Sequence, residues 1–423
     1  MFSQGGLSLE QAPPISVVLR FFVTASIFGV LLGIFILFSN FNLLSSTQYS
    51  FELIVVHTLS LGVMASFMLG AMFQMLPVIA GVVIKMATKK AMVAHILLVI
   101  GIFLQIGAFK TGSSLLYLAT AIILGSGLLH ASTLMLKELI KVKNHSSSSK
   151  GMVFALSSFI LAIIFGIFML LVLGGYIDGS FFSQIKEVHY SFALFGWITL
   201  LIISISFQVV EMFYVTPKYP NIMSRYLVIS LFLLLILKMI ILFSGLDAII
   251  VNIILALLFI LYATITIMRL YKRRRPTSDA TVWFWRLGMS FLIITSSIML
   301  VNSSNETIKD ISYITFIGFA LSIVFAMVYK IVPFLVWFHL SNQGYMEAPM
   351  MHDVIHPKKA KIHFYIHISL FSLWIINIFF DIFLLKILLD ILLISSFGLL
   401  LYNLLYAINK YRYTQRNFEP IKW

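Results

Sequence analysis

Histidine is the residue type in this chain best suited to chemistry, because the sequence contains ten histidines and no cysteine. The lack of cysteine excludes disulfides, thiolate metal sites, iron–sulfur clusters and covalent haem attachment through a C-x-x-C-H motif. Two histidines, His57 and His189, lie within long apolar runs. A neutral imidazole in such surroundings needs a partner. We therefore treat both as candidate metal or cofactor ligands, the alternative being a hydrogen bond to a neighbouring helix or a place at the membrane interface.

The other histidines form two groups. His95 and His130 lie in the third and fourth apolar runs, where they are either a second pair of ligands or satisfied packing residues. The second group contains two histidines four residues apart, which share one helical face, and two in the loop before them: His363, His367, His352 and His356. Imidazoles at this spacing are typical of copper or zinc ligands. Contact with lipid phosphates or with the acidic groups of a cofactor is the alternative.

The composition indicates the elements that must position these side chains. Of the 423 residues 61% are hydrophobic and 10% are charged, and the mean hydropathy is +1.05, whereas about 25% of the residues in a soluble domain are charged. So few charges cannot cover a water-exposed surface. The formal net charge of +14 is not a nucleic-acid signal, because the basic residues sit in short loops between apolar runs. We therefore expect a single integral membrane domain over residues 1–423.

Twelve mostly apolar stretches are each long enough to cross about 30 Å of hydrocarbon. All should be helices, because an open strand edge in lipid would leave backbone groups unpaired. We place them at 16–38, 51–76, 91–109, 113–136, 152–175, 187–215, 224–244, 246–269, 281–302, 309–338, 361–380 and 386–408.

The basic residues assign a side to each loop. Lys110, Lys186, Lys309 and Lys386 fall on one side of the membrane, whereas nearly all other Lys and Arg residues between spans fall on the other. Because cytoplasmic loops carry the excess of positive charge, both termini should be cytoplasmic. The membrane itself is expected to be a bacterial inner membrane. His57 and His189 are then near the outer surface, and His95 and His130 are on the inner side. The run from Ser146 to Ser149 is typical of a flexible linker.

Spans two, six and ten resemble one another. Spans two and ten share a glycine, an aromatic–polar pair and a proline at equal spacing: Gly62, Phe73, Gln74 and Pro77 in the first, and Gly318, Tyr329, Lys330 and Pro333 in the second. Span six keeps Gly196 and the pair Phe207-Gln208. The pattern predicts three four-helix units in a pseudo-threefold arrangement, centred on 51–76, 187–215 and 309–338. Chance recurrence in helices of biased composition is the alternative.

Helical projection separates the faces of spans two and six. In span two, the methionines share the face of His57, and Gly62, Ser66 and Gly70 form a small-residue ridge opposite, which predicts close approach of another helix. In span six, four side chains share the face of His189 and could admit a flat ligand or pack against another helix: Ala193, Gly196, Ser204 and Phe207.

The first two spans resemble those of a known family. The string His57-x4-Gly62-x7-Gly70-x6-Pro77-x3-Gly81, preceded by Arg20-Phe21-Phe22, is similar to the NnrS-type membrane proteins, which are polytopic haem proteins associated with nitric-oxide stress. More distantly, twelve spans in three units resemble subunit I of the haem-copper oxidases. The resemblance implies at least one non-covalent b-type haem near the outer face, with His57 and His189 as its axial ligands, and a possible second haem at His95 and His130.

The same resemblance limits the chemistry. Haem-copper oxidases carry two histidines in span ten and copper-binding histidines in spans six and seven. In this chain Tyr313 is at the equivalent position of span ten, and span seven has no histidine. A complete proton-pumping oxidase is therefore not expected. The implied function is electron transfer or the handling of nitric oxide or another diatomic gas, with turnover as an enzyme left open.

Two other functions remain open from the residues. A proton-coupled secondary transporter would use the intramembrane lysines Lys238 and Lys330, with Glu211 and the histidines, for coupling. A copper-handling assembly factor would use the histidine group of residues 352–367. Lys330 lies near a span end and can reach water, whereas Lys238 is deeper and needs a partner, for which Asp390, Glu211 or a haem propionate are candidates. Nucleotide-binding and hydrolase motifs are lacking.

Overall fold

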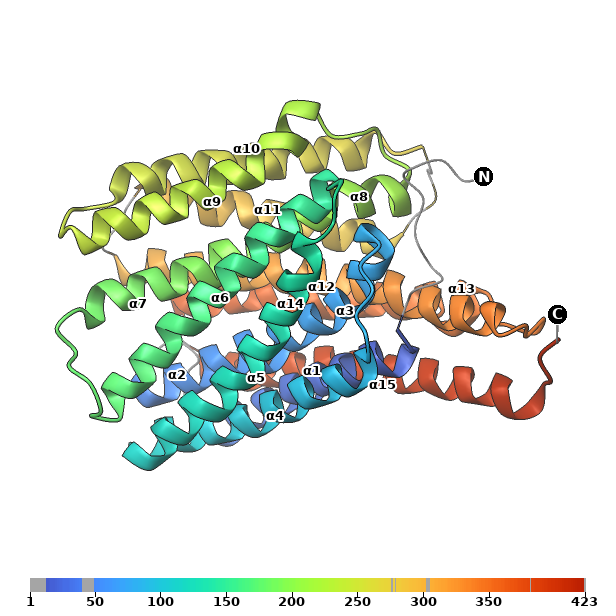
Figure 1. Ribbon diagram of the computed structural model, residues 1–423, viewed down its shortest axis with the longest axis horizontal. Helices are drawn as coiled ribbons and strands as arrows, with labels where there is room; N and C mark the ends of the chain where they lie inside the picture. The colour runs from blue at the N-terminus through green and yellow to red at the C-terminus, as the bar shows by residue number, and fades with distance from the viewer. Residues whose placement is uncertain are drawn as a thin grey trace.

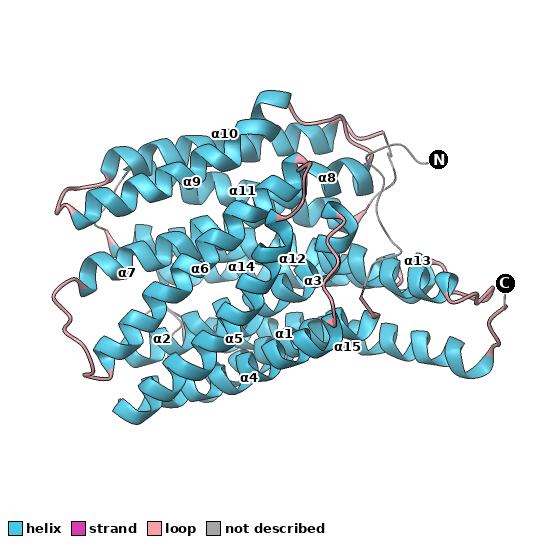
Figure 2. Cartoon of the chain, in the orientation of Figure 1, coloured by secondary structure: helices cyan, strands magenta, loops and turns pink. Residues whose placement is uncertain are grey.

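The computed structural model describes residues 13–39, 49–274, 277, 279–301, 305–380 and 382–421. Within those ranges the regular structure is helical, with short connections and no strand (Figures 1 and 2). Two segments, η1 and η2, are π-helical. The elements are α1 (Ile15–Ser39), α2 (Tyr49–His57), η1 (Thr58–Ala65), α3 (Ser66–Ala80), α4 (Ala87–Thr111), α5 (Ser114–Ile140), α6 (Ser147–Leu173), α7 (Phe182–Tyr190), η2 (Ser191–Thr199), α8 (Leu200–Tyr214), α9 (Asn221–Phe243), α10 (Ile249–Tyr271), α11 (Ala280–Val301), α12 (Glu306–Asn342), α13 (Met351–Val354), α14 (Pro357–Phe380) and α15 (Phe383–Asn417).

Twelve helical stretches of the described chain are long and apolar enough to cross a membrane, which confirms the predicted all-α multi-span fold. Span two is the continuous run α2–η1–α3, and span six is the run α7–η2–α8. The predicted limits differ most at α15, which continues to Asn417 rather than ending at 408. A span predicted from hydropathy ends at the first polar residues. The helix itself can continue into water, because its backbone hydrogen bonds and the helix propensities of its residues do not depend on hydrophobicity. Residue 302, the predicted end of span nine, lies outside the described residues.

The predicted linker at Ser146–Ser149 is instead a helix start. Ser146 is the N-cap of α6, and its hydroxyl oxygen accepts a hydrogen bond of 3.1 Å from the backbone N–H of Ser149. Serine is favoured at this position because its side chain satisfies an otherwise unpaired backbone donor. The expectation of a flexible linker was therefore wrong, since the same serine-rich composition also suits a helix cap.

Spans two, six and ten are the most enclosed of the described spans. Protein buries 67% of the apolar window in span two and 72% in each of spans six and ten, against 28–50% in the others. The glycine ridge of span two packs against α1: a Cβ atom on Gly62 would lie 2.9 Å from Cγ of Phe28, and one on Gly70 would lie 2.6 Å from Cβ of Phe21. The predicted close helix approach is thus present. The arrangement in three equivalent units stays a prediction.

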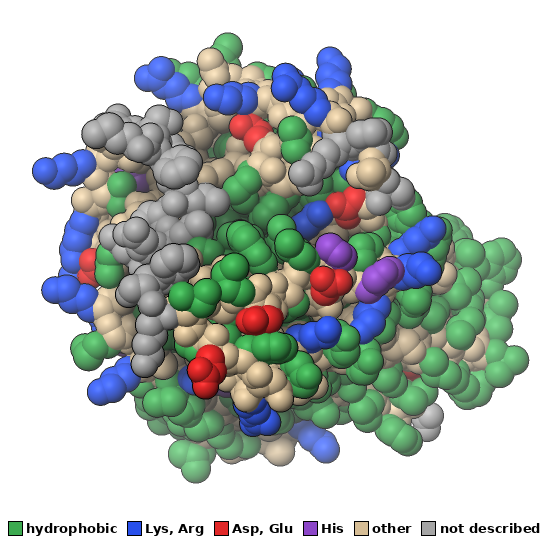
Figure 3. All heavy atoms as spheres, turned by 90° about the vertical axis from the view of Figure 1, so that its right-hand side faces the viewer, with side chains coloured by type: hydrophobic (Ala, Val, Ile, Leu, Met, Phe, Trp, Pro, Cys, Tyr) green, Lys and Arg blue, Asp and Glu red, His purple; other side chains and the backbone are tan. Residues whose placement is uncertain are grey.

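Both the start of α1 and the end of α15 lie at one end of the bundle (Figure 1). Figure 3 views this end and shows Lys and Arg side chains around its rim. Exposed lysines at this end include Lys85 and Lys143 in the connections and Lys358 in the first turn of α14. The opposite end carries α2 and α7, the helices that contain His57 and His189. The two histidines therefore lie toward the less basic end.

We expect Gly70→Ala to destabilise the protein by about 1–3 kcal/mol, because the new methyl group overpacks against Cβ of Phe21, which α1 holds in place. Gly107→Ala is the matched control, since its Cβ would meet only Leu116 Cδ1 at an ordinary 3.4 Å. Thermal unfolding in detergent measures both. Equal stability of the two variants would contradict a tight contact between α1 and α3.

Candidate cofactor site between spans two and six

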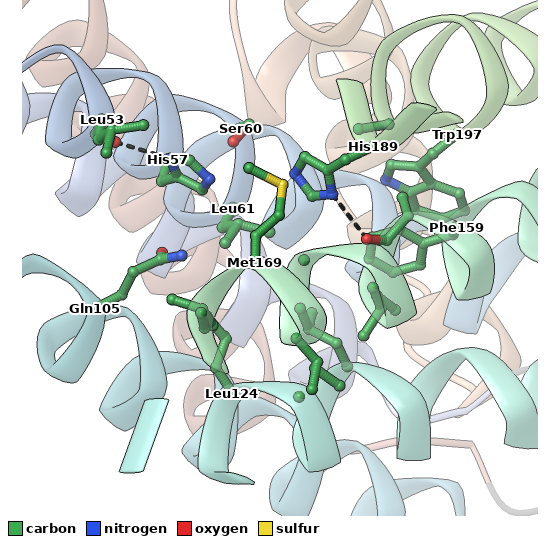
Figure 4. Close-up of a pocket in the computed structure, with 18 of the residues that line it drawn as sticks. Leu53, His57, Ser60, Leu61, Gln105, Leu124, Phe159, Met169, His189 and Trp197 are labelled. Carbon is green, nitrogen blue, oxygen red and sulfur yellow. Dashed lines mark hydrogen bonds between the residues drawn. The ribbon is translucent and has the colours of Figure 1, made fainter. Parts of the chain in front are cut away.

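A cavity of about 110 Å³ lies among spans two to six, toward the end that carries α2 and α7 (Figure 4). Most of its lining is apolar, and its polar members come from three different spans. The residues that shape it include Leu53, His57, Ser60, Leu61, Gln105, Phe109, Leu124, Gly125, Phe159, Ala162, Gly166, Met169, His189, Ala193 and Trp197. The structure therefore brings together the two histidines that the sequence singled out, which are far apart in the chain.

Each of these imidazoles donates a hydrogen bond through Nδ1 to a backbone carbonyl. His57 bonds the carbonyl oxygen of Leu53 in its own helix at 2.8 Å. His189 bonds the carbonyl oxygen of Ala162, in α6, also at 2.8 Å. A carbonyl only accepts, so the proton of each neutral ring is on Nδ1 and Nε2 keeps a free lone pair. This is the tautomer in which a histidine binds a metal through Nε2.

The two rings face one another across the cavity (Figure 4). Their centroids are 6.4 Å apart and their planes differ by 18°. Two Nε2 lone pairs cannot hydrogen-bond to each other, because neither atom carries a proton. With metal–imidazole bonds of about 2.0–2.1 Å, and about 1.1 Å from Nε2 to each ring centre, two rings on opposite sides of one metal ion would have centroids about 6.3 Å apart. The observed separation agrees with that value.

Two matching π-helical segments, η1 and η2, flank the candidate cofactor site. η1 begins directly after His57, and η2 begins two residues after His189. A hydroxyl near the end of each bonds a carbonyl five residues earlier: Ser66 Oγ to Leu61 at 3.3 Å, and Thr199 Oγ1 to Leu194 at 2.9 Å. π-helical turns are rare and concentrate at functional sites. The sequence similarity of spans two and six thus extends to the backbone, whereas span ten is α-helical throughout.

The predicted small-residue surface of span six lines the cavity only in part. Ala193 is in its wall. Gly196 instead packs against α6, where a Cβ atom would lie 2.6 Å from Cβ of Ser158, and Phe207 packs edge-on against Tyr219. A regular α-helical projection does not hold across η2, because the π turn shifts the faces. The glycine beside His189 is Gly166 of α6, on which a Cβ would lie 3.0 Å from the imidazole Cε1.

Two cavity residues were not among the sequence candidates. Gln105 of α4 is 4% exposed, and its Oε1 has no hydrogen-bond partner among the described residues. Met169 of α6 extends toward both rings in Figure 4. An amide within an apolar run was a signal available in the sequence. Met169 carried no signal, because methionine is a common gap-filler in helical interiors.

His95 and His130 do not form a comparable pair. His95 shares a 2.8 Å hydrogen bond through Nε2 with the Thr24 hydroxyl and stands edge-on to Phe21. His130 Nε2 is buried without a partner. No contact between the two rings is present in the described part of the chain. A second haem at these residues stays a prediction.

The histidines near the basic end are separated by the fold. His363 and His367 are fully buried in α14. His363 has both ring nitrogens occupied, Nδ1 by the Tyr329 hydroxyl at 2.9 Å and Nε2 by Ser396 Oγ at 2.8 Å. His367 Nε2 bonds Ser322 Oγ at 2.8 Å. These bonds join α14 to α12 and α15, which is a packing role.

His352 and His356 are exposed, on α13 and the turn after it. His356 Nδ1 accepts a 3.2 Å bond from the Lys358 backbone N–H. Three or more His, Asp or Glu residues do not gather into a metal-binding group anywhere in the described ranges. The metal site expected at His352, His356, His363 and His367 is therefore not assembled here, because two of its members point into the bundle and two face solvent.

Both intramembrane lysines have acidic partners. Lys238 Nζ lies 3.0 Å from Glu187 Oε1, a partner that sequence reasoning missed in favour of Asp390 and Glu211. Glu187 precedes His189 by two residues, so this ion pair joins α9 to the helix that carries the imidazole. Lys330 Nζ lies 2.6 Å from Asp279 Oδ2. Burial alone would raise the pKa of Asp279, but Lys330 and the bonds from Thr281 outweigh it and lower that pKa.

Comparison with known proteins adds no family: neither a protein-family model nor a curated protein sequence matches this chain. The features that bear on function are therefore the geometry of the cavity and the sequence motif around His57.

We expect His363→Leu to destabilise the protein by about 1–3 kcal/mol, because it leaves the Tyr329 and Ser396 hydroxyls without their partner. Bound metal or cofactor should be unaffected. His356→Ala, at an exposed position, is the control and should change neither property. Thermal unfolding and metal analysis of the purified protein test this, and loss of a stoichiometric metal in either variant would contradict the packing role.

Proposed function

We propose that the chain is a membrane protein that binds one b-type haem between His57 and His189 and uses it for electron transfer. The observation that carries the proposal is the pair of facing Nε2 atoms, with ring centroids 6.4 Å apart. The donor set fits the cofactor, because haem iron accepts two neutral imidazoles along one axis. The apolar lining would exclude water from the ring faces. Because the cavity is only about 110 Å³ in volume, side chains such as Met169 would have to move to admit the macrocycle.

The protein groups that orient the two imidazoles are uncharged backbone carbonyls. The carbonyls of Leu53 and Ala162 hold both imidazoles in the ligating tautomer. A bound haem would supply a one-electron couple, and His57 and His189 are the residues that would hold its iron. Paired imidazoles therefore favour electron transfer over the binding of nitric oxide or another diatomic gas, which would require one ring to move away.

The surroundings support a place in the bacterial inner membrane, with both termini cytoplasmic. The end that carries the start of α1 and the end of α15 is ringed by Lys and Arg (Figure 3), and the positive-inside rule predicts that such an end is cytoplasmic. The cavity is nearer the other end. A haem in this cavity would then exchange electrons with a partner on the outer side of the membrane.

We expect purified full-length protein to show the sharp reduced bands of six-coordinate haem, and His57→Ala and His189→Ala each to lose them. Either change removes an axial nitrogen and leaves the iron with one ligand. His95→Ala is the control, since that ring bonds Thr24 outside the cavity. Absorption spectra of the oxidised and reduced proteins decide the matter: unchanged bands in both cavity variants, or a wild-type protein that takes up no haem, would overturn the assignment.

A copper-handling role is the second candidate, and Met169 is the observation that favours it. Its thioether extends toward both imidazoles (Figure 4), and Met with His is a ligand set for Cu(I). On this alternative, colourless protein should contain one copper per chain, and Met169→Leu should lower its copper affinity about tenfold. Metal analysis distinguishes the two candidates, because haem bands without copper would exclude this one.

A further inference from the structure

Gln105 is a buried amide that the described residues leave unsatisfied. It is 4% exposed and lines the same cavity as both imidazoles. Phe109, one helical turn further along α4, packs against the His57 ring with centroids 5.1 Å apart. Figure 4 shows the Gln105 side chain extending into the cavity from the same side as His57. The amide therefore lies in the wall of the cavity, on the side of His57.

An amide in this position needs a partner. Its Oε1 is buried without a hydrogen bond, and no described residue bonds its Nε2. Leaving such a group unpaired is unfavourable, and the other side chains around the cavity are almost all apolar. The hydrogen bonds of the described residues include none from Gln105 Nε2, so a molecule that fills the cavity can bond this donor if it presents an acceptor atom at this wall.

We propose that Gln105 is a positioning residue that donates a hydrogen bond from Nε2 to a carboxylate of the bound cofactor. This inference rests on the proposed haem. The polar groups on the rim of a b-type haem are its two carboxylate side chains, and an amide N–H bonds a carboxylate more strongly than a neutral oxygen. No Arg or Lys lines the cavity in the described part of the chain, so the neutral donors in its wall are the amide of Gln105, the hydroxyl of Ser60 and the indole N–H of Trp197. Gln105 is the one that comes from α4.

Gln74 provides a matched control. It is also a buried glutamine in a transmembrane helix, 2% exposed, with neither amide atom bonded. It faces a different cavity, of about 30 Å³, which neither imidazole lines. Replacement of either glutamine by methionine keeps the length of the side chain and removes an unsatisfied polar group. Both changes should therefore raise the thermal stability of the cofactor-free protein.

The test is a titration of cofactor-free, full-length protein with hemin and with hemin dimethyl ester, whose carboxylates are blocked. We expect Gln105→Met to weaken hemin binding about tenfold and to affect the ester much less, whereas Gln74→Met leaves both affinities unchanged. Equal losses for hemin and the ester, or equal behaviour of the two variants, would overturn the role of Gln105. Wild-type protein that binds neither compound would overturn the proposed haem itself, and the inference with it.

Discussion

The structure depends on how a neutral imidazole is held in an apolar interior. His57 and His189 each donate their single ring proton to a backbone carbonyl, at 2.8 Å. Those carbonyls already belong to helices, so the bonds require no further polar side chain in the membrane. The free-energy cost of burying the ring is thereby reduced, and the second nitrogen of each ring is left as a free acceptor. An acceptor that faces another acceptor across an apolar cavity has no hydrogen-bond partner among the described residues, and this is the feature on which the proposed ligand site rests.

The backbone around the two histidines supports this arrangement. η1 and η2 come after His57 and His189 in spans two and six, which are among the most enclosed spans of the described chain. A π turn inserts one residue into a helix and rotates the C-terminal part of that helix relative to its N-terminal part. Each histidine can therefore face the cavity while the remainder of its span packs on α1 or α6. The Lys238–Glu187 ion pair adds a further connection to the helix that carries His189.

Sequence reasoning identified the spans, the concentration of positive charge at one end and the pairing of His57 with His189, because hydropathy and charge act locally along the chain. It did not find Gln105, the π segments or Glu187. These features depend on which helices become neighbours, and a one-residue shift in helical phase changes every inferred face. Gly196 shows this, since projection placed it below His189 whereas it packs against Ser158. The histidines at 352–367 are close in sequence, but the fold separates their side chains. Two are buried in the bundle and two are exposed.

The contrast between His57 and His363 shows how differently two imidazoles are hydrogen-bonded in this bundle. Both lie in transmembrane helices, but His363 meets hydroxyls on both sides, from Tyr329 and Ser396. Asn403 donates to the Tyr329 hydroxyl, so the tyrosine proton is directed at Nδ1 and the proton of His363 goes to Ser396. Both nitrogens of that ring are satisfied within the protein. The cavity between spans two and six is lined mostly by apolar side chains such as Leu61, Leu124 and Phe159, and no described hydroxyl bonds either imidazole there. His57 and His189 therefore differ from His363 in the partners of their rings, since each is bonded through Nδ1 alone.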